Sequence, residues 1–241
     1  MKTEYSIFTD KGGRPVNEDS ADFAKNGERY CFILCDGLGG HGMGDKASEL
    51  AVAFIKERFM SCESTDEFAS DVLIRAQSAI KERQAAEPRL KHMRTTAVVL
   101  VIDGERGIAL HIGDSRLYRF RDGRVVSRTR DHSIPQMLCL TGEIEESEIR
   151  CHPDRNKLLR CLGEDREETR FERSDFDVRE GDAFLLCSDG FWEPVTEDVM
   201  ERLLAENGRV KKWLAAMQRA AEKNGGSSMD NYTAIAVTVR E

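Results

Sequence analysis

Two aspartate-glycine pairs in the middle of the chain constrain its fold more than any other feature. Asp103-Gly104 separates strand patterns at residues 95–102 and 107–112, and Asp122-Gly123 follows a third strand pattern at 116–120. An Asp-Gly pair between two such runs is typical of the tight turn of a β-hairpin, whose strands are antiparallel. The sequence therefore predicts antiparallel sheets, which disfavours a doubly wound fold built on a parallel sheet.

The hydrophobic pattern indicates both further strands and several helices. Strand patterns also occur at 30–35, 183–187 and 232–239, and helical patterns at 45–60, 66–86, 197–206 and 209–223. No repeat, linker or low-complexity stretch divides the chain. We therefore expect an α+β fold with a single domain over residues 1–241. Its irregular segment at about 129–170 is expected to contain short helices at 145–150 and 155–161.

Composition and sequence pattern disfavour several classes of protein. The chain has 44 acidic and 36 basic residues and a net charge of −8, so the phosphates of a nucleic acid would repel it. No apolar run approaches the roughly 20 residues of a membrane-spanning helix, and MKTEYSIFTD lacks the pattern of a signal peptide. The seven cysteines form no C-x-x-C pair. We expect them to be reduced thiols, packed as small apolar side chains, in a cytoplasmic protein.

The glycine-rich segment DGLGGHGMGD, residues 36–45, admits two interpretations. Its glycines match the G-x-G-x-x-G turn of a dinucleotide-binding fold. That fold also needs an acidic residue about 20 positions later at the end of a second strand, whereas Glu57 lies within a helical pattern. A phosphate-binding P-loop needs a lysine where Asp45 stands. The alternative is that Asp36, which precedes the glycines, carries the function.

Four aspartates lie where apolar strand patterns begin or end. Asp36 follows FILC, Asp189 follows the similar run FLLCS, Asp114 follows GIALHIG, and Asp230 precedes the last strand. A single aspartate in such a place is usually part of a turn. Four carboxylates that converge would instead raise one another's pKa, and a cation is the usual remedy. Oxygen ligands without histidine or cysteine favour Mg²⁺ or Mn²⁺ over zinc.

Eight short motifs follow one another along nearly the whole chain. They are RPVNED (14–19), DGLGGHGMGDKAS (36–48), TTAVV (95–99), IGDSRLY (112–118), RDHS (130–133), HPDRNKLLRCLG (152–163), LLCSDGFWE (185–193) and MDNYT (229–233). In this order they resemble the metal-dependent serine/threonine protein phosphatases of the PPM, or protein phosphatase 2C, type. The resemblance implies a four-layer α/β/β/α sandwich, in which two antiparallel sheets lie face to face between helices. A metal centre is expected at one end of the sheets.

The resemblance also implies a set of metal ligands. Asp36 is expected to bridge two metal ions, with the carbonyl of Gly37 supporting one of them. Asp189 and Asp230 are expected to hold the other ion, and Asp114 matches a third, weaker position. The expected ions are Mn²⁺ or Mg²⁺.

The remaining candidate residues belong to the N-terminal motif. The resemblance implies that Glu18 and Asp19 orient metal-bound water and that Arg14 grips the phosphate of the substrate. A water activated between the two ions would attack phosphorus in line. No phosphoenzyme is needed, so no cysteine is expected to act as a nucleophile.

The sequence departs from the family pattern at two positions. Leu38 stands where some members have a histidine that is proposed as the acid for the leaving alcohol. His41 is a weaker candidate for that role than a metal-bound water. Arg94 stands where the family usually has glycine, and we interpret it as a local surface change. Structural roles are expected for three other histidines, His111, His132 and His152.

These observations predict a phosphatase that acts on phosphoserine and phosphothreonine in proteins. The resemblance to compact bacterial members implies that it opposes a serine/threonine kinase, and we expect a monomer. Two rival hypotheses are a nucleotide-binding protein and a catalytically silent relative that serves as a binding or sensing module. The second is disfavoured because Asp36, Asp189 and Asp230 are all retained.

Overall fold

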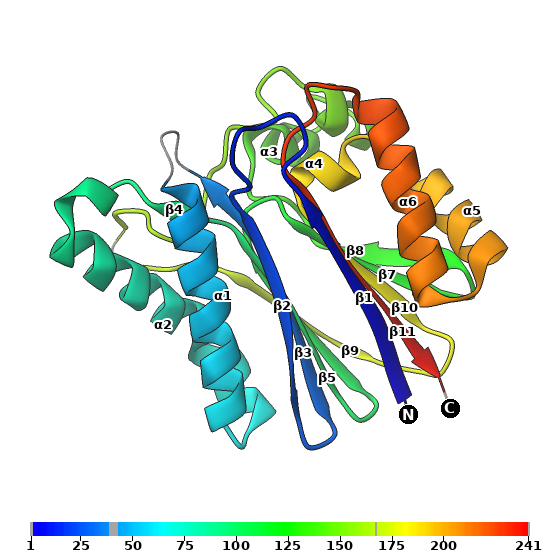
Figure 1. Cartoon of the computed structure of the whole chain (residues 1–241), viewed down its shortest axis with the longest axis horizontal. Coiled ribbons are helices and arrows are strands. Elements are labelled where there is room, and N and C mark those ends of the chain that lie inside the picture. The colour runs from blue at the N-terminus through cyan, green and yellow to red at the C-terminus, as the bar shows by residue number, and fades with distance from the viewer. Residues whose placement is uncertain (1, 39–42, 167, 241) are drawn as a thin grey trace.

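The strands form two antiparallel sheets in the computed structural model, which describes residues 2–38, 43–166 and 168–240 (Figure 1). The first sheet has the order β1 (Lys2–Asp10), β11 (Tyr232–Arg240), β10 (Ala183–Cys187), β7 (Arg116–Arg121) and β8 (Arg124–Arg128). The second has the order β2 (Asp19–Asn26), β3 (Arg29–Leu38), β5 (Ala97–Asp103), β6 (Arg106–Ile112) and β9 (Glu172–Asp177), with β4 (Arg94–Thr95) beside β3.

Both predicted hairpins are present. In the first, Asp103 of β5 lies opposite Arg106 of β6. In the second, β7 and β8 are joined through Asp122 and Gly123, whose φ angles are 52° and 75°. Left-handed backbone at both central residues suits a two-residue turn that matches the twist of the strands, which is why Asp-Gly is favoured there.

Helices cover the outer face of each sheet (Figure 1). α1 (Gly44–Ser61) and α2 (Thr65–Ala86) pack on the second sheet, whereas α4 (Asp189–Trp192), α5 (Glu197–Asn207) and α6 (Val210–Gly225) pack on the first. This arrangement confirms the predicted four-layer α/β/β/α sandwich. Among the described residues, no helix combines the length and the apolar character that crossing a membrane requires.

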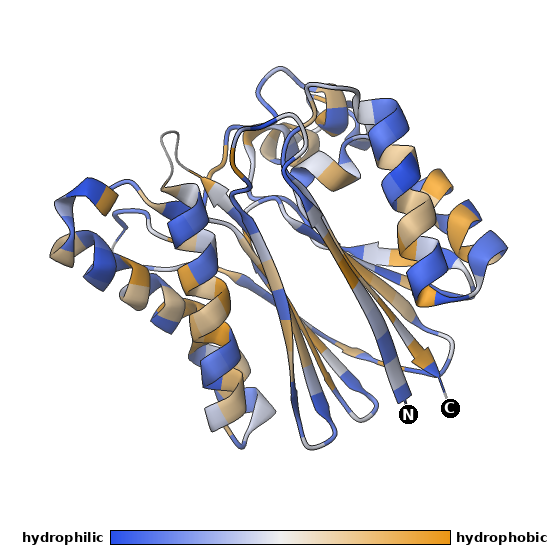
Figure 2. Ribbon diagram, viewed as in Figure 1, coloured by the Kyte–Doolittle hydropathy of each residue, from blue (hydrophilic) through white to orange (hydrophobic). Residues whose placement is uncertain are grey.

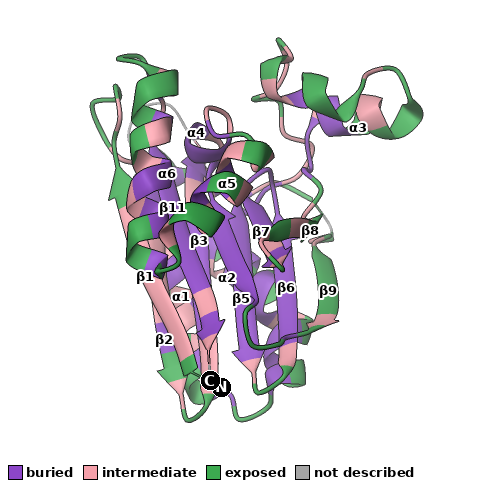
Figure 3. Ribbon diagram, turned by 90° about the vertical axis from the view of Figure 1, so that its right-hand side faces the viewer, coloured by how far each residue is buried: buried purple, intermediate pink, exposed green. Residues whose placement is uncertain are grey.

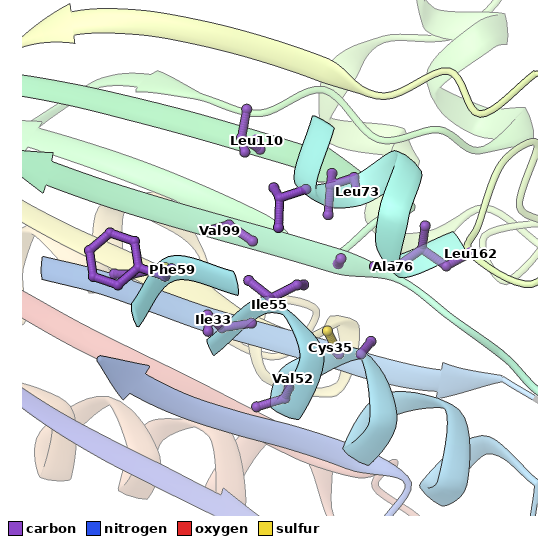
Figure 4. Packing of buried hydrophobic residues seen from close by; sticks show 14 of the residues in the cluster. Ile33, Cys35, Val52, Ile55, Phe59, Leu73, Ala76, Val99, Leu110 and Leu162 are labelled. Atoms are coloured by element: carbon purple, nitrogen blue, oxygen red, sulfur yellow. The ribbon is translucent and has the colours of Figure 1, made fainter. Parts of the chain in front are cut away.

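The central strands β3, β5, β10 and β11 are mainly apolar because most of their residues are buried on both faces of the sheet (Figure 2). In β3, the alternate residues Cys31, Ile33 and Cys35 pack against α1 and α2 (Figure 4). Phe32 and Leu34 point the other way, into the layer between the two sheets. The same alternation in β10 explains why FILC and FLLC look alike in the sequence.

The irregular segment differs from the prediction. A helix, α3 (Ile134–Thr141), was not expected, and the helix expected at 145–150 is the 3-10 helix η2 (Glu146–Cys151). The helix expected at 155–161 is absent: residues 153–156 form turns, and Leu158 and Leu162 form isolated bridges with Ser133 and Thr95. Figure 3 shows exposed, intermediate and buried residues along α3.

The packing of α1 gives a test of this fold. Ile55 is fully buried against the second sheet, whereas Ile74 of α2 is 45% exposed. Replacing Ile55 with alanine should lower the free energy of unfolding by about 2–4 kcal/mol, because it leaves a cavity. The matched change Ile74→Ala should alter it by less than about 0.5 kcal/mol. Urea denaturation followed by circular dichroism measures both, and equal effects would contradict this packing.

Candidate active site

The predicted aspartates gather at the end of the sandwich opposite the chain termini (Figure 1). Asp19 at the start of β2 is the register partner of Asp36 near the end of β3. Asp189 follows the end of β10, and Asp230 precedes β11, the strand that pairs with β10 there. Asp114 follows the end of β6. Antiparallel pairing therefore brings together residues that lie far apart in the sequence.

The carboxylates of these residues act strongly on one another. Burial and then the charges of Asp19, Asp189, Asp114 and Asp230 raise the pKa of Asp36 well above its usual value. Burial also raises the pKa of Asp19 to about 7, and burial followed by the charge of Asp230 raises that of Asp189 to about 6. Like charges held this close need a cation or protons to neutralise them.

One buried oxygen atom of the cluster lacks a hydrogen-bond partner among the described residues. The side-chain Oδ2 of Asp19 accepts a hydrogen bond from Oγ of Ser188 at 2.7 Å. Its Oδ1 is buried and has no hydrogen-bond partner among the described residues. An acceptor left in this state is costly unless something binds it. Because the atoms available as metal ligands around it are carboxylate oxygens, the residues present fit Mg²⁺ or Mn²⁺.

The backbone of Asp36 is fixed by two threonines that the sequence analysis had not assigned to the site. Oγ1 of Thr96 accepts a hydrogen bond from the Asp36 amide at 3.0 Å, and Thr95 Oγ1 donates to the Asp36 carbonyl at 2.8 Å. Thr96 Oγ1 also lies 2.7 Å from Oγ of Ser115, beside Asp114. The Thr96 hydroxyl thus links the chain segments that carry Asp36 and Asp114. The motif TTAVV was the sequence feature that could have pointed to these two threonines.

Arg14 lies at the rim of the carboxylate cluster. Its Nη2 donates to Oδ2 of Asp230 at 2.6 Å, and its side chain is 56% exposed. Glu18, from the same loop, is half-buried, and burial followed by the charge of Asp45 raises its pKa. The structure therefore brings both residues of the N-terminal motif to the site.

A second residue missed from the sequence, Asn231, holds this loop in place. Its Oδ1 accepts a hydrogen bond from the Glu18 amide at 2.8 Å. Its Nδ2 donates to the carbonyls of Lys11 and Val16, both at 2.9 Å. One amide side chain thereby ties the loop that carries Arg14 and Glu18 to the residue next to Asp230. Its place directly after Asp230 in MDNYT was the only sequence signal.

Gly37 is needed for close packing rather than for a nucleotide cradle. A Cβ atom at this position would lie 2.2 Å from the carbonyl oxygen of Gly44 and 2.5 Å from that of Glu18. The backbone of β3, the N-terminus of α1 and the Glu18 loop therefore meet at a point where only glycine fits. His41, the candidate acid, lies outside the described residues.

The backbone of Asp114 is held by a hydrogen bond from a tryptophan side chain. Nε1 of Trp192 donates to the carbonyl of Asp114 at 3.0 Å. The guanidinium of Arg116 stacks on the Trp192 ring at 3.4 Å and forms a buried two-bond ion pair with Asp131 at 2.8 and 2.6 Å. This pair joins β7 to the start of the irregular segment that precedes α3.

Two of the histidines, one from β6 and one from the start of the irregular segment, form a stacked pair. The rings of His111 and His132 are 4.8 Å apart and almost parallel, and Glu172 lies beside His132. His132 Nδ1 accepts the amide hydrogen of Gly113, so its other nitrogen carries the proton and faces Glu172 at 3.4 Å. That nitrogen has no free lone pair for a metal ion. These contacts favour the expected structural role over metal binding.

Comparison with known proteins decides the family. A family model described as protein phosphatase 2C matches residues 12–232. The chain belongs to this family. Within the protein phosphatase 2C family it is similar to the serine/threonine protein phosphatase PstP of Mycobacterium tuberculosis, with 32% identity over 98% of this chain. The chain spans 45% of the length of that relative.

One further relative and one solved structure match this chain along almost their whole length. The serine/threonine phosphatase stp of Listeria innocua is 31% identical, covering 95% of this chain and 93% of the relative. Among solved structures, the catalytic domain of PstP in complex with two manganese ions has a TM-score of 0.84 and 29% identity, and 99% of each chain is covered.

The two departures from the family pattern prove to be neighbours. Leu38 at the end of β3 is the register partner of Arg94 in β4. Arg94 is half-buried, and its Nε is a buried donor without a partner among the described residues. The interpretation of Arg94 as a surface change was therefore incomplete, since its side chain lies partly inside the protein.

The stacked histidines predict a pH effect on stability. Burial, followed by the nearby charges of His111 and Arg160, lowers the pKa of His132 to about 4, although Glu172 opposes this. Between pH 6.5 and 4 the unfolded chain then binds a proton that the folded chain does not, so stability falls as pH falls. Replacing His132 with glutamine removes this difference. Going from pH 7.5 to 5, the free energy of unfolding of the wild type should fall relative to His132→Gln by about 1–2 kcal/mol.

Urea denaturation of both proteins at the two pH values measures this difference. The titration of the aspartate cluster is common to both proteins and cancels in the comparison. A gap between wild type and variant that does not change with pH would contradict a neutral, buried His132.

Proposed function

We propose that the chain is a metal-dependent protein phosphatase that hydrolyses phosphoserine and phosphothreonine. One observation carries the proposal: five aspartates converge at one end of the sandwich, and a buried oxygen of Asp19 lacks a partner among the described residues. The family and its serine/threonine phosphatase members support the same conclusion. We also propose that the whole chain forms a single phosphatase domain, because the motifs from both halves contribute to the one site.

The proposed ligands follow from the position of each carboxylate. Asp36 lies within reach of the charges of all the others and would bridge two ions, supported by the Gly37 carbonyl. Asp189 and Asp230 would hold the second ion, and Asp114 a third. Divalent Mn²⁺ or Mg²⁺ would supply activation of a water nucleophile near neutral pH.

The chain's own residues would bind and orient the substrate. Arg14 is exposed, permanently charged and held at the rim by Asp230, so it can offer its remaining N–H groups to a phosphate. Glu18 and Asp19 would accept hydrogen bonds from water beside the carboxylates. Leu38 cannot donate a proton, so the departing alcohol would take its proton from water.

The substrates and setting are proposals that rest on the family. We propose phosphoproteins as substrates, including a serine/threonine kinase or its targets, and a monomeric enzyme. All seven cysteines are free thiols, and four of them lie in the apolar cores. Because disulfides are rare in reducing compartments, this supports a cytoplasmic location.

The ligand assignment predicts which substitutions abolish activity. Asp36→Asn and Asp189→Asn should each lower Mn²⁺-dependent release of phosphate from p-nitrophenyl phosphate by at least roughly 100-fold, because each removes a charge that holds the ions. The control Asp165→Asn changes an aspartate whose side chain is 85% exposed and should retain full activity. Undiminished activity in both active-site variants, or after chelation of the metal, would overturn the proposal.

Asn231 gives a second prediction about the loop of Arg14 and Glu18. In Asn231→Asp the side chain keeps its shape but cannot donate to the Lys11 and Val16 carbonyls. We expect kcat/KM to fall by roughly 10–100-fold, as for other residues that orient a metal site. Asn207→Asp, which changes an amide at the end of α5, serves as the control. Equal activity of the two folded variants would rule out a positioning role for Asn231.

A further inference from the structure

A cavity of about 360 Å³ opens beside the carboxylate cluster. Asp189, Asp230 and Arg14 line one end of it, and its remaining wall combines the segment at 150–156 with the C-terminal end of α6. It is large enough to receive a side chain next to the one that reaches the carboxylates. The residues of this wall are placed to contact a side chain that neighbours the phosphorylated residue.

Two arginines of the irregular segment face this cavity, and they differ in what they can bind. Both terminal nitrogens of Arg150 are engaged, and its Nη2 donates to both carboxylate oxygens of Glu197 at 2.9 and 2.7 Å. Its Nη1 donates to the carbonyls of Glu193 and Val195, both at 3.3 Å. Arg150 thus forms a rigid wall and has few donors left for a ligand.

Arg155 is the arginine that remains available. Only its Nε is engaged, in a 2.8 Å bond to Oε1 of Glu193, and its side chain is 39% exposed. Its Nη1 and Nη2 have no hydrogen-bond partner among residues 2–38, 43–166 and 168–240. The bond to Glu193 fixes the guanidinium plane and leaves four N–H donors for an anionic group.

The balance of charge in the cavity favours such a group once the aspartates hold cations. Asp189 and Asp230 are then neutralised, and Glu197 offsets the charge of Arg150. The charges left on the wall are those of Arg14 and Arg155 against that of Glu193. The part of the cavity beyond the phosphate position is therefore basic.

We propose that this cavity is a subsite for a negatively charged side chain adjacent to the phosphorylated residue, and that Arg155 is the residue that selects it. The inference rests on the proposed phosphatase function and specifies its substrate class. A carboxylate and a second phosphate share the required chemistry, because both accept paired hydrogen bonds from a guanidinium.

Matched phosphopeptides test the proposal. Phosphothreonine peptides carry glutamine, glutamate or the non-hydrolysable phosphonate analogue of phosphoserine at the position before or after the phosphothreonine, and kcat/KM is measured with Mn²⁺ for each. The wild type should prefer one of the anionic peptides over its glutamine counterpart by about five- to tenfold, as expected for a partly exposed charge-assisted bond. The glutamate and phosphonate arms show which anion fits better.

Substitution of Arg155 then identifies the selecting residue. In Arg155→Ala the kcat/KM for the anionic peptide divided by that for the glutamine peptide should fall to about one. Arg155→Lys keeps the charge but not the paired N–H groups of the guanidinium, so it should give an intermediate ratio. Lys157→Ala is the matched control: Lys157 pairs with Asp154, is 63% exposed and does not line the cavity. Its ratio should equal that of the wild type.

Two results would overturn the subsite. One is an unchanged ratio in Arg155→Ala. The other is an equal loss in Arg155→Ala for both peptides and for p-nitrophenyl phosphate, since Arg155 would then act through Glu193 on the neighbouring Asp189. The absence of metal-dependent phosphate release from every substrate in the wild type would instead refute the proposed function itself.

Discussion

Repulsion between buried carboxylates is the constraint on which the rest of this structure depends. Asp19 and Asp36 face each other as register partners of adjacent strands, and Asp114, Asp189 and Asp230 complete the cluster from other strand ends. Such an arrangement is unfavourable in a protein without ions, so the fold must hold it in place. The rigid sandwich does this, because each central strand is buried on both faces and cannot shift without moving two hydrophobic layers.

Neutral side chains also hold the carboxylate cluster in place through hydrogen bonds. Thr96 fixes the Asp36 backbone, Ser188 holds one oxygen of Asp19, and Asn231 ties the Arg14 loop to the residue beside Asp230. None of these groups neutralises the carboxylates, so their negative charge remains available to cations. Charged carboxylates thus set the electrostatics of the site, whereas neutral side chains position it. A change such as Asn231→Asp therefore tests the positioning role.

Much of this could be predicted from the sequence. Apolar strands that end in aspartate, together with two Asp-Gly turns, indicate antiparallel strands with acidic ends, and the ordered motifs indicate the family and its four layers. The less apolar strands β1, β2 and β9 were not predicted, because partly exposed strands lack a strong hydrophobic pattern. β8 was implied only by the Asp122-Gly123 turn. Asn231 and Thr96 were missed because their roles depend on contacts between residues 60 or more positions apart. The absence of the helix expected at 155–161 is likewise tied to bridges with distant residues.

Anomalous diffraction from crystals soaked in Mn²⁺ tests the central claim most directly, because it locates the ions without relying on activity. The account predicts two strong manganese peaks that share the Asp36 carboxylate, one of them bound by Asp189 and Asp230, with a weaker third peak at Asp114. In Asp36→Asn crystals the shared pair should be lost. Manganese bound at His111, His132 and Glu172, or an empty aspartate cluster in the wild type, would contradict the account.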